Sequence, residues 1–209
     1  MSSIAIIDYR AGNLTSVRLS LSTLGAVGEI TSDPEAILKA DRVIFPGVGA
    51  AGAAMGHLND LGLADVLREY VASGRPFLGI CLGTQIIFDH SDEDGGVDGV
   101  GLFKGNVTMF RPDNPRDKVP HMGWNSVSFK REHPIFAGIE EGSEFYFVHS
   151  YYPVPDQEED IVAQSDYAGV TFTAAVARAN AAATQFHPEK SGKVGLKLLE
   201  NFLNWDGSC

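Results

Sequence analysis

Cys81 lies in a segment whose residue types and spacing are suited to nucleophilic chemistry. It follows the short apolar run 76–80, has Gly79 and Gly83 on either side, and is followed by a helical pattern of apolar residues. A strand, a tight turn with a nucleophile at its tip and a helix form a nucleophile elbow, here with cysteine in place of serine. The alternative is a buried, inert cysteine at the end of a strand. The two glycines favour the elbow, because larger residues beside the nucleophile would collide with neighbouring backbone.

His187 and Glu189 provide what a thiolate nucleophile requires, which is a base and a carboxylate that orients the base. The two residues are two positions apart, so their side chains leave the same face of an extended segment. Pro188 between them disfavours a helix and stiffens the pair. A polar turn before the last helix would also explain this segment by itself. Together with Cys81, however, the segment favours a catalytic Cys-His-Glu triad.

Further residues are candidates for binding the substrate and stabilising an oxyanion. The N–H of Leu82, at the start of the elbow helix, supplies one donor, and Gln85 on the same helix is a substrate-binding candidate. Gly47, Val48 and Gly49 follow a neighbouring predicted strand and supply a second donor through the N–H of Val48. The alternative for this loop is a tight strand-to-helix turn of fixed conformation.

The segments 79–85 and 185–189 together resemble the class I glutamine amidotransferases. The segments 8–14, 46–49, 120–125 and 146–151 narrow the resemblance to the glutaminase subunits of imidazole glycerol phosphate synthase, which act in histidine biosynthesis. The resemblance extends from the first predicted strand to the last predicted helix. Two positions depart from the family pattern, because Arg10 stands where glycine is expected and Thr84 where methionine is commoner. Neither position belongs to the triad.

The resemblance implies that the chain hydrolyses glutamine to glutamate and ammonia. It also implies that the ammonia passes to a partner, a (β/α)₈ cyclase subunit that makes imidazole glycerol phosphate. No cofactor is expected. The resemblance also implies that the N–H of Val48 points away from Cys81 until the cyclase is occupied.

The same resemblance implies a surface that contacts the cyclase. Its candidate residues are Pro120, His121, Met122, Gly123, Trp124, Asn125, Tyr146 and Lys190. From the residues alone, the better interpretation is that Trp124 caps a core strand, and only the resemblance favours the interface. His149 lies in an aromatic, strand-like segment, which indicates a structural or interface histidine rather than a catalytic base.

Composition limits the remaining possibilities. Sixteen basic and 27 acidic residues give a net charge of −11, which argues against nucleic acid or an anionic membrane as the main partner. No apolar run reaches the ~20 residues of a membrane-spanning helix, and no signal-peptide pattern is present. The two cysteines form no disulfide framework, and Cys209 is expected to be an exposed thiol without a role. We therefore expect a cytoplasmic protein.

Metal sites are not expected from this sequence. No Cys/His spacing suits a metal ion, and the acidic segment 91–96 lacks the ligand spacing of a calcium loop. A solvated surface loop is the better interpretation of this segment.

Strand and helix patterns alternate in the first half, which predicts an α/β fold with a doubly wound, mostly parallel central sheet. The second half is rich in strands, so an antiparallel excursion is expected there. A single domain over residues 1–209 is expected. The predicted strands are 3–8, 28–31, 42–45, 76–80, 106–110, 124–129, 144–152, 161–164, 170–178 and 182–187. The predicted helices are 14–24, one beginning at Pro34, 51–59, 63–72, 82–90 and 191–205. Functional residues should gather at the carboxyl ends of the parallel strands.

Two other functions remain open. The first is an amidotransferase subunit that serves another acceptor, such as anthranilate or carbamoyl phosphate synthesis, and the segments 120–125 and 146–151 disfavour it. The second is a non-catalytic α/β binding module with a cysteine at an elbow, which would have no need of the pair formed by His187 and Glu189.

Overall fold

The computed structural model describes residues 2–10, 12–114 and 116–208, so Cys209 lies outside the described residues. The helices are α1 (Leu14–Thr23), α2 (Pro34–Lys39), α3 (Ala51–Asp60), α4 (Leu63–Ala72), α5 (Leu82–Ile86) and α6 (Gly192–Asn204). The strands of the first half are β1 (Ile4–Ile7), β2 (Gly28–Thr31), β3 (Arg42–Gly47), β4 (Phe77–Cys81), β5 (Phe88–Ser91) and β6 (Val97–Asp98). Those of the second half are β7 (Phe103–Met109), β8 (His121–Ser126), β9 (Ser128–Phe129), β10 (Glu144–His149), β11 (Tyr151–Pro155), β12 (Ile161–Tyr167), β13 (Val170–Arg178) and β14 (Ala181–Thr184).

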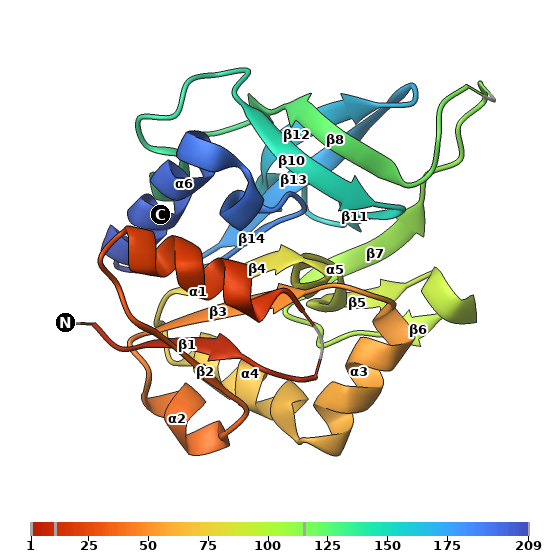
Figure 1. Cartoon of the computed structure of the whole chain (residues 1–209). Helices are drawn as coiled ribbons and strands as arrows, with labels where there is room; N and C mark the ends of the chain where they lie inside the picture. Colours follow the sequence, from red (N-terminus) through yellow and green to blue (C-terminus); the bar gives the residue numbers. More distant parts are fainter. Residues whose placement is uncertain (1, 11, 115, 209) are drawn as a thin grey trace.

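The central sheet has eight strands in the order β2-β1-β3-β4-β14-β13-β12-β9. Pairing is parallel from β2 through β14 and antiparallel from β14 to β9. Figure 1 shows α1 and α6 on one face of this sheet and α2, α3 and α4 on the other. The prediction of a doubly wound, mostly parallel sheet with an antiparallel excursion is therefore confirmed.

Alternation along the buried strands builds a core on each face of the sheet. In β1, Ile4 and Ile6 pack in the same apolar cluster as residues of α1 and α6. Ala5 and Ile7 pack in the other cluster, with residues of α2, α3 and α4. Successive side chains of a strand point to opposite faces, so a strand covered by helices on both sides is apolar at every position. This explains why the parallel strands appear in the sequence as continuous apolar runs.

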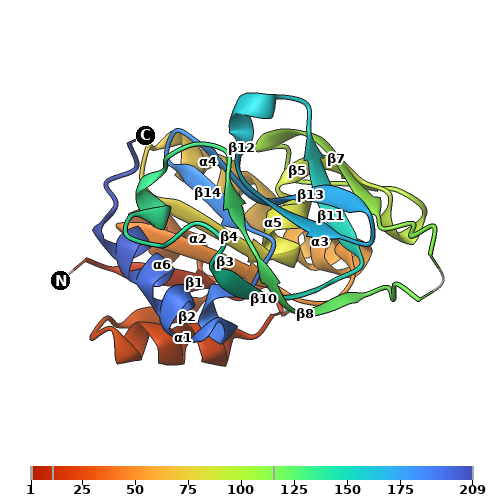
Figure 2. The ribbon, with the colours of Figure 1, turned by 90° about the horizontal axis from the view of Figure 1, so that it is seen from above.

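Two smaller sheets extend the second half of the chain. Strands β8 and β10 form an antiparallel pair, and β11-β7-β5-β6 form a four-stranded sheet. Seen from above in Figure 2, β8 and β10 lie beside each other near α6 and the centre of the molecule. The predicted strand 144–152 is therefore two strands, β10 and β11, which belong to different sheets.

One helix prediction needs correction. The elbow helix was expected to reach residue 90, but α5 ends at Ile86 and β5 follows. Every residue from 82 to 88 is buried, so the apolar pattern cannot separate a short helix from the strand after it. Asn13 precedes α1, but its side chain makes no capping hydrogen bond. By contrast, Asp33 caps α2 by accepting a hydrogen bond from the N–H of Glu35.

None of the helices in the described part of the chain is long and apolar enough to cross a membrane.

Arg10 occupies a backbone conformation that explains why glycine is expected there. Its φ is 65°, in the left-handed region, and its N–H donates to the side chain of Asp8 at 2.9 Å. A residue with a Cβ atom pays about 1–2 kcal/mol for this conformation, whereas glycine adopts it freely. Arginine in place of glycine at position 10 therefore introduces local backbone strain in an exposed turn.

We expect Arg10→Gly to stabilise the protein, because it removes this strain. Part of the gain is offset by the greater freedom of glycine in the unfolded chain, so an increase in melting temperature of about 1–3 °C is expected. Arg10→Ala is the matched control, since it removes the charge but keeps the Cβ atom. An equal gain in melting temperature for the alanine variant would show that charge, not backbone strain, is responsible.

Candidate active site

Three neighbouring parallel strands end at the place where the predicted site residues meet. Strands β3, β4 and β14 are adjacent, with Gly47 paired to Cys81 and Thr184 paired to Ile80. The carboxyl ends of parallel strands lie at one edge of a sheet. The turn at Cys81, the loop that contains Val48 and the segment leading to His187 therefore gather at this edge.

Cys81 has the strained backbone of a nucleophile elbow. Its φ is 55° and its ψ is −109°, between the end of β4 and the start of α5. A non-glycine residue in such a conformation costs of order 1–3 kcal/mol, which the surrounding structure must offset. The sulfur is buried; the thiol donates to the carbonyl of Val148 at 3.8 Å and accepts from Nε2 of Gln185 at 3.9 Å.

The glycines beside Cys81 are required by close packing, as the sequence predicts. A Cβ atom added to Gly83 would lie 2.0 Å from the carbonyl oxygen of Phe45, and one added to Gly79 would lie 2.9 Å from the Cβ of Ala183. Strands β3 and β14 therefore enclose the elbow so closely that no side chain fits at either glycine.

His187 and Glu189 form a buried pair. Nδ1 of His187 lies 2.7 Å from Oε1 of Glu189, and their side chains are 2% and 1% exposed. The backbone of His187 is fixed from two sides, because its N–H donates to the carbonyl of Tyr146 and its carbonyl accepts from the hydroxyl of Ser191. The carboxylate thus orients the ring, and Nε2 of the ring, which has no hydrogen-bond partner among the described residues, is left available.

The electrostatic surroundings favour the imidazolium form of His187. Burial opposes that charge, but the negative charges of Cys81 and Glu189 outweigh burial and raise the pKa of His187 to about 10. Near neutral pH, the histidine therefore carries a proton beside the sulfur. A protonated histidine in this position can act as a general acid.

A cavity of about 270 Å³ opens at this edge of the sheet. It is lined by Val48, Gly49, Cys81, Leu82, Gln85, Glu93, Pro120, Val148, His149, Ser150, Tyr151 and His187. The structure therefore brings together six residues that the sequence predicts for the catalytic and substrate-binding set. Gly47 pairs with Cys81 just behind this wall, and Glu189 lies behind His187.

The side chain of Gln85 links two segments of the cavity wall by hydrogen bonds. Its Nε2 donates to the carbonyl of Tyr151 at 2.8 Å and to Oε1 of Gln185 at 3.0 Å. Gln185 in turn contacts the sulfur of Cys81. The sequence offers a signal for Gln185, since it begins the segment that contains His187, but its role beside the thiol depends on the pairing of β14 with β4.

Glu93 is a cavity residue that sequence reasoning missed. Its carboxylate accepts from the N–H of Ala51 at 2.8 Å, and Asp94 accepts from the N–H of Gly52 at 3.1 Å. Both carboxylates thus cap the N-terminus of α3, directly after the Val48 loop. Burial raises the pKa of Glu93, with partial compensation by the hydrogen bond from Ala51. Most of the segment 91–96 is exposed, as expected of a surface loop, but the capping of α3 by Glu93 and Asp94 was not predicted.

Thr84, the second departure from the family pattern, has a place for its hydroxyl. The hydroxyl donates to the carbonyl of Thr184 at 2.6 Å in the interior. The polar group is satisfied by β14, so the substitution leaves no buried unpaired oxygen.

Three residues predicted for the partner-facing surface lie together. Trp124 of β8 pairs across the strands with Tyr146 of β10, with ring centroids 6.2 Å apart. The ammonium group of Lys190 lies 5.9 Å from the ring centroid of Tyr146. Trp124 is 53% exposed and Met122 is 64% exposed. The alternative that Trp124 belongs to a core strand is therefore wrong.

The other members of that set lie in different surroundings. Pro120 lines the cavity, and Gly123 and Asn125 are half-buried on β8. His121 is only 3% exposed, because its side chain points inward from β8. The side chain of His121 is thus part of the interior and is not on the exposed surface.

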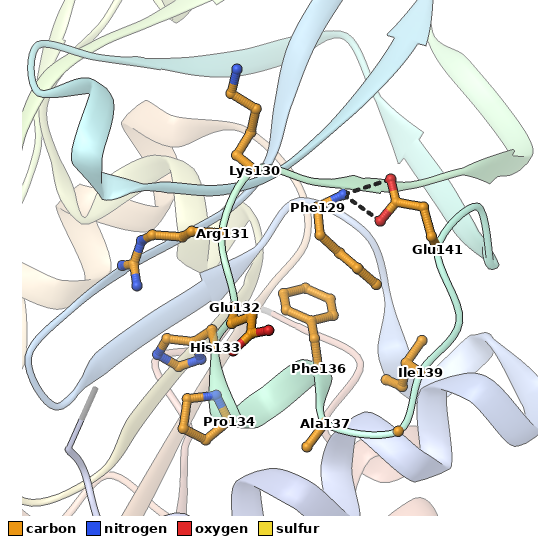
Figure 3. Close-up of a pocket in the computed structure, with 11 residues that line it drawn as sticks. Phe129, Lys130, Arg131, Glu132, His133, Pro134, Phe136, Ala137, Ile139 and Glu141 are labelled. Atoms are coloured by element: carbon orange, nitrogen blue, oxygen red, sulfur yellow. Dashed lines mark hydrogen bonds between the residues drawn. The ribbon is translucent and has the colours of Figure 1, made fainter.

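A second, larger cavity lies away from these residues. It has a volume of about 840 Å³ and is lined by residues 129–134, 136–139 and 141 (Figure 3). Both carboxylate oxygens of Glu141 accept from the N–H of Phe129, and Arg131 donates to the carbonyls of Glu159 and Ala177. This cavity contains none of the predicted site residues. In the described part of the chain, no group of three or more His, Cys, Asp or Glu residues is arranged to hold a metal ion.

Comparison with known proteins agrees with this geometry. The family model for class-I glutamine amidotransferases matches residues 5–205. The chain is 50% identical to imidazole glycerol phosphate synthase subunit HisH of Chromobacterium violaceum, covering 98% of this chain and 99% of the relative. It is 48% identical to the protein of the same name from Pseudomonas putida, covering 99% of each.

Solved structures with low sequence identity share the fold. PurLQS from Thermotoga maritima superposes with a TM-score of 0.73 at 19% identity, covering 98% of this chain and 99% of the other. The glutaminase domain of Trypanosoma brucei CTPS gives a TM-score of 0.66 at 18% identity, covering 99% and 95%. The family match and the near-full-length relatives decide the assignment: this chain belongs to the class-I glutamine amidotransferases and, within them, to the HisH subunits of imidazole glycerol phosphate synthase.

Proposed function

We propose that this chain hydrolyses glutamine to glutamate and ammonia, with Cys81 as nucleophile, and delivers the ammonia to a (β/α)₈ cyclase subunit that makes imidazole glycerol phosphate in histidine biosynthesis. One observation carries the proposal. In a member of this family, Cys81 at a strained elbow shares a cavity with His187, which is held by Glu189.

The first half of the reaction forms a thioester. The thiolate of Cys81 attacks the side-chain carboxamide carbon of glutamine, and the carbonyl oxygen becomes an oxyanion. The N–H of Leu82, at the start of α5, is one candidate donor to that oxyanion, and the N–H of Val48 is the second. His187 gives its proton to the departing nitrogen, so that the C–N bond breaks and ammonia leaves.

The second half of the reaction releases glutamate. His187, now neutral, takes a proton from water, and the resulting hydroxide attacks the γ-glutamyl thioester. Collapse of this intermediate breaks the C–S bond and regenerates the thiolate. Throughout, Glu189 fixes the imidazole through its 2.7 Å contact and favours the charged form of the ring.

Substrate recognition is supported by the polar groups of the cavity. Glu93 is the one carboxylate among the described residues that line it, and only its Oε2 is bound to Ala51. We therefore propose Glu93 as the group that attracts the α-ammonium of glutamine. Gln85 contributes indirectly, because its side chain is already bound to Tyr151 and Gln185.

The partner follows from the product. Ammonia released into water at neutral pH is protonated and loses its nucleophilicity, so its acceptor site must lie close by. The surface formed by Met122, Trp124, Tyr146 and Lys190 is exposed and aromatic, as interface cores are. We propose that it contacts the cyclase, with residues 1–209 acting as one glutaminase domain in the cytoplasm, where a free nucleophilic thiol remains reduced.

An amidotransferase that serves a different acceptor is the competing function. The structural relatives at 18% and 19% identity support the fold alone. The relatives at 48% and 50% identity are both named as imidazole glycerol phosphate synthase subunits, which favours the cyclase.

We expect Cys81→Ser to abolish glutamine-dependent synthesis in the complex with the cyclase, because an alcohol lacks the nucleophilicity of a thiolate. His187→Ala should be nearly as damaging. Synthesis with added ammonium salts should continue in both variants, which controls for folding and assembly. Near-wild-type glutamine hydrolysis in Cys81→Ser would contradict the proposed function.

Glu189→Gln should be milder and should change the pH profile. The carboxylate raises the pKa of His187, so the acid form of His187 is lost as pH rises through about 10 in the native protein. Removing the negative charge lowers that pKa and moves the alkaline limb of kcat to lower pH. An unchanged alkaline limb would show that Glu189 does not support the imidazolium.

The N–H of Val48 is predicted to be required for full activity and to point away from Cys81 without partner and substrate. Locking the loop at Gly47 is not a clean test, since a Cβ atom there would lie 2.2 Å from the Tyr9 hydroxyl. Val48→Pro instead removes the donor, and Val48→Ala keeps it. We expect a loss of roughly 10²–10³ in stimulated kcat for the proline variant only. Equal rates in the two variants would exclude Val48 as a donor.

Lys190→Ala is expected to weaken docking of the cyclase. Its ammonium group lies on the rim beside Tyr146, in a chain with a net charge of −11, and we propose that it pairs with an acidic residue of the cyclase. Calorimetric titration should show weaker binding by about three- to thirtyfold, with the melting temperature of the free chain unchanged. Lys39→Ala is a matched control on a distant helix. If both variants bind equally well, the surface is placed wrongly.

A further inference from the structure

A chain of hydrogen bonds between two buried histidines leads from strand β8 to the wall of the thiol cavity. His121 and His149 are paired across β8 and β10, and each is about 95% buried or more. Nδ1 of His121 lies 3.0 Å from Nε2 of His149. Nδ1 of His149 lies 2.7 Å from the carbonyl oxygen of Tyr151. Nothing in the proposed reaction uses either ring.

The carbonyl of Tyr151, at one end of this chain of hydrogen bonds, determines which nitrogen of each histidine ring carries a hydrogen. A carbonyl oxygen only accepts, so Nδ1 of His149 must carry a hydrogen and Nε2 of the neutral ring must accept. His121 then donates through Nδ1–H, and its Nε2 is left as an acceptor. The amide nitrogen of Asn125 lies 3.4 Å from this Nε2 and supplies a hydrogen. Both rings are therefore in the Nδ1–H tautomer.

The orientation of the Asn125 amide is set independently of the histidines. Its Nδ2 also donates to the carbonyl of Asp166 at 2.9 Å, and its Oδ1 accepts from the N–H of Ser126 at 2.9 Å. The amide therefore presents nitrogen, not oxygen, to His121. The direction of the whole chain, from Asn125 to Tyr151, follows from these backbone partners.

The surroundings keep both rings neutral and in place. His121 is stacked between the rings of Tyr167 and Phe147, with centroids 3.9 and 5.0 Å away. Burial lowers the pKa of His121 to about 4 and is the main cause that lowers the pKa of His149 to about 3. Neither ring is protonated near neutral pH, so neither carries the charge that would break the pattern of donors.

The Tyr151 end of this chain of hydrogen bonds contacts residues of the proposed catalytic site. The Tyr151 carbonyl that accepts from His149 also accepts from Nε2 of Gln85 at 2.8 Å. Gln85 is bound to Gln185, which contacts the sulfur of Cys81. His149 and Tyr151 both line the cavity. A change in the tautomer or orientation of the His149 ring would therefore shift the Tyr151 carbonyl, to which Gln85 is also bound.

We propose that His121 and Asn125 are positioning residues for the thiol site: they fix the Nδ1–H tautomer and ring orientation of His149, which holds the Tyr151 carbonyl where Gln85 also binds it. The kinetic part of this proposal rests on the proposed function of the cavity. The assignment of tautomers rests on geometry alone.

The tautomers are measured first, in the full chain labelled with ¹⁵N at histidine, by long-range ¹H–¹⁵N correlation spectra. His121→Asn and His149→Gln assign the two signals. Free imidazole in water prefers the Nε2–H form, so the expected result, Nδ1–H for both rings between pH 6 and 8, is distinctive. An Nε2–H tautomer for either ring overturns the proposal, and this measurement on the native protein requires no stable variant.

The kinetic test compares two variants of His121 in the complex with the cyclase. His121→Asn keeps an N–H donor near the position of Nδ1, whereas His121→Leu removes the donor, and both lose the stacked ring. We expect kcat/KM for glutamine to fall about tenfold in the leucine variant and to be largely restored in the asparagine variant, at similarly lowered melting temperatures. Equal kcat/KM in the two variants would mean that packing alone matters, and would overturn the positioning role.

Asn125→Asp tests the outer end of the chain. A carboxylate in place of the amide favours a proton on Nε2 of His121, so His121 should become doubly protonated at a pH well above its native pKa, visible in the same spectra. No change in the His121 signals would exclude Asn125 from the chain. Failure of the proposed function is distinguishable, because it would show as retained activity in Cys81→Ser with the histidine tautomers unaffected.

Discussion

Close backbone contact around Cys81 is the constraint on which the rest of this structure depends. The turn that carries Cys81 is inserted between β3 and β14, and Gly83 faces the carbonyl of Phe45 with no space for a Cβ atom. Gly47 is confined in the same way by the hydroxyl of Tyr9 and by the backbone at Gly83. The elbow, the Val48 loop and the end of β1 therefore hold one another in position, so the strained φ and ψ of Cys81 persist.

Burial of the His187–Glu189 pair adds a second requirement. Removing a charged pair from water costs several kcal/mol unless its remaining hydrogen-bonding groups are satisfied. Here the backbone of His187 is bound by Tyr146 and Ser191, but Nε2 of His187 and Oε2 of Glu189 have no partner in the described part of the chain. The unpaired nitrogen faces a cavity that also contains Cys81. The site thus retains an unsatisfied group at the position where the proposed reaction transfers a proton.

The sequence was sufficient for the parallel half of the fold and for placing Cys81, His187 and Glu189 at one edge of the sheet, because both depend on local signals. Apolar runs alternate with helical patterns through α4, and the elbow and the segment around His187 each carry their own turn residues. The features that the sequence did not predict are those that depend on tertiary pairing. Nothing local separates β10 from β11 at Ser150, and α5 is buried all round, so neither boundary had a pattern to follow. Glu93 was missed and the ring of His121 was misplaced for the same reason: their partners, Ala51 and His149, are far away in sequence.

The two-stranded sheet formed by β8 and β10 explains how the exposed aromatic surface and the cavity that contains Cys81 come to share one wall. Successive residues of a strand point to opposite faces, so Trp124 and Tyr146 share the outer face, while His121 and His149 share the inner face. Val148, on the outer register, contributes its carbonyl to the Cys81 sulfur at 3.8 Å. The aromatic pair on the outside and the histidine pair on the inside are therefore separated by a single layer of backbone.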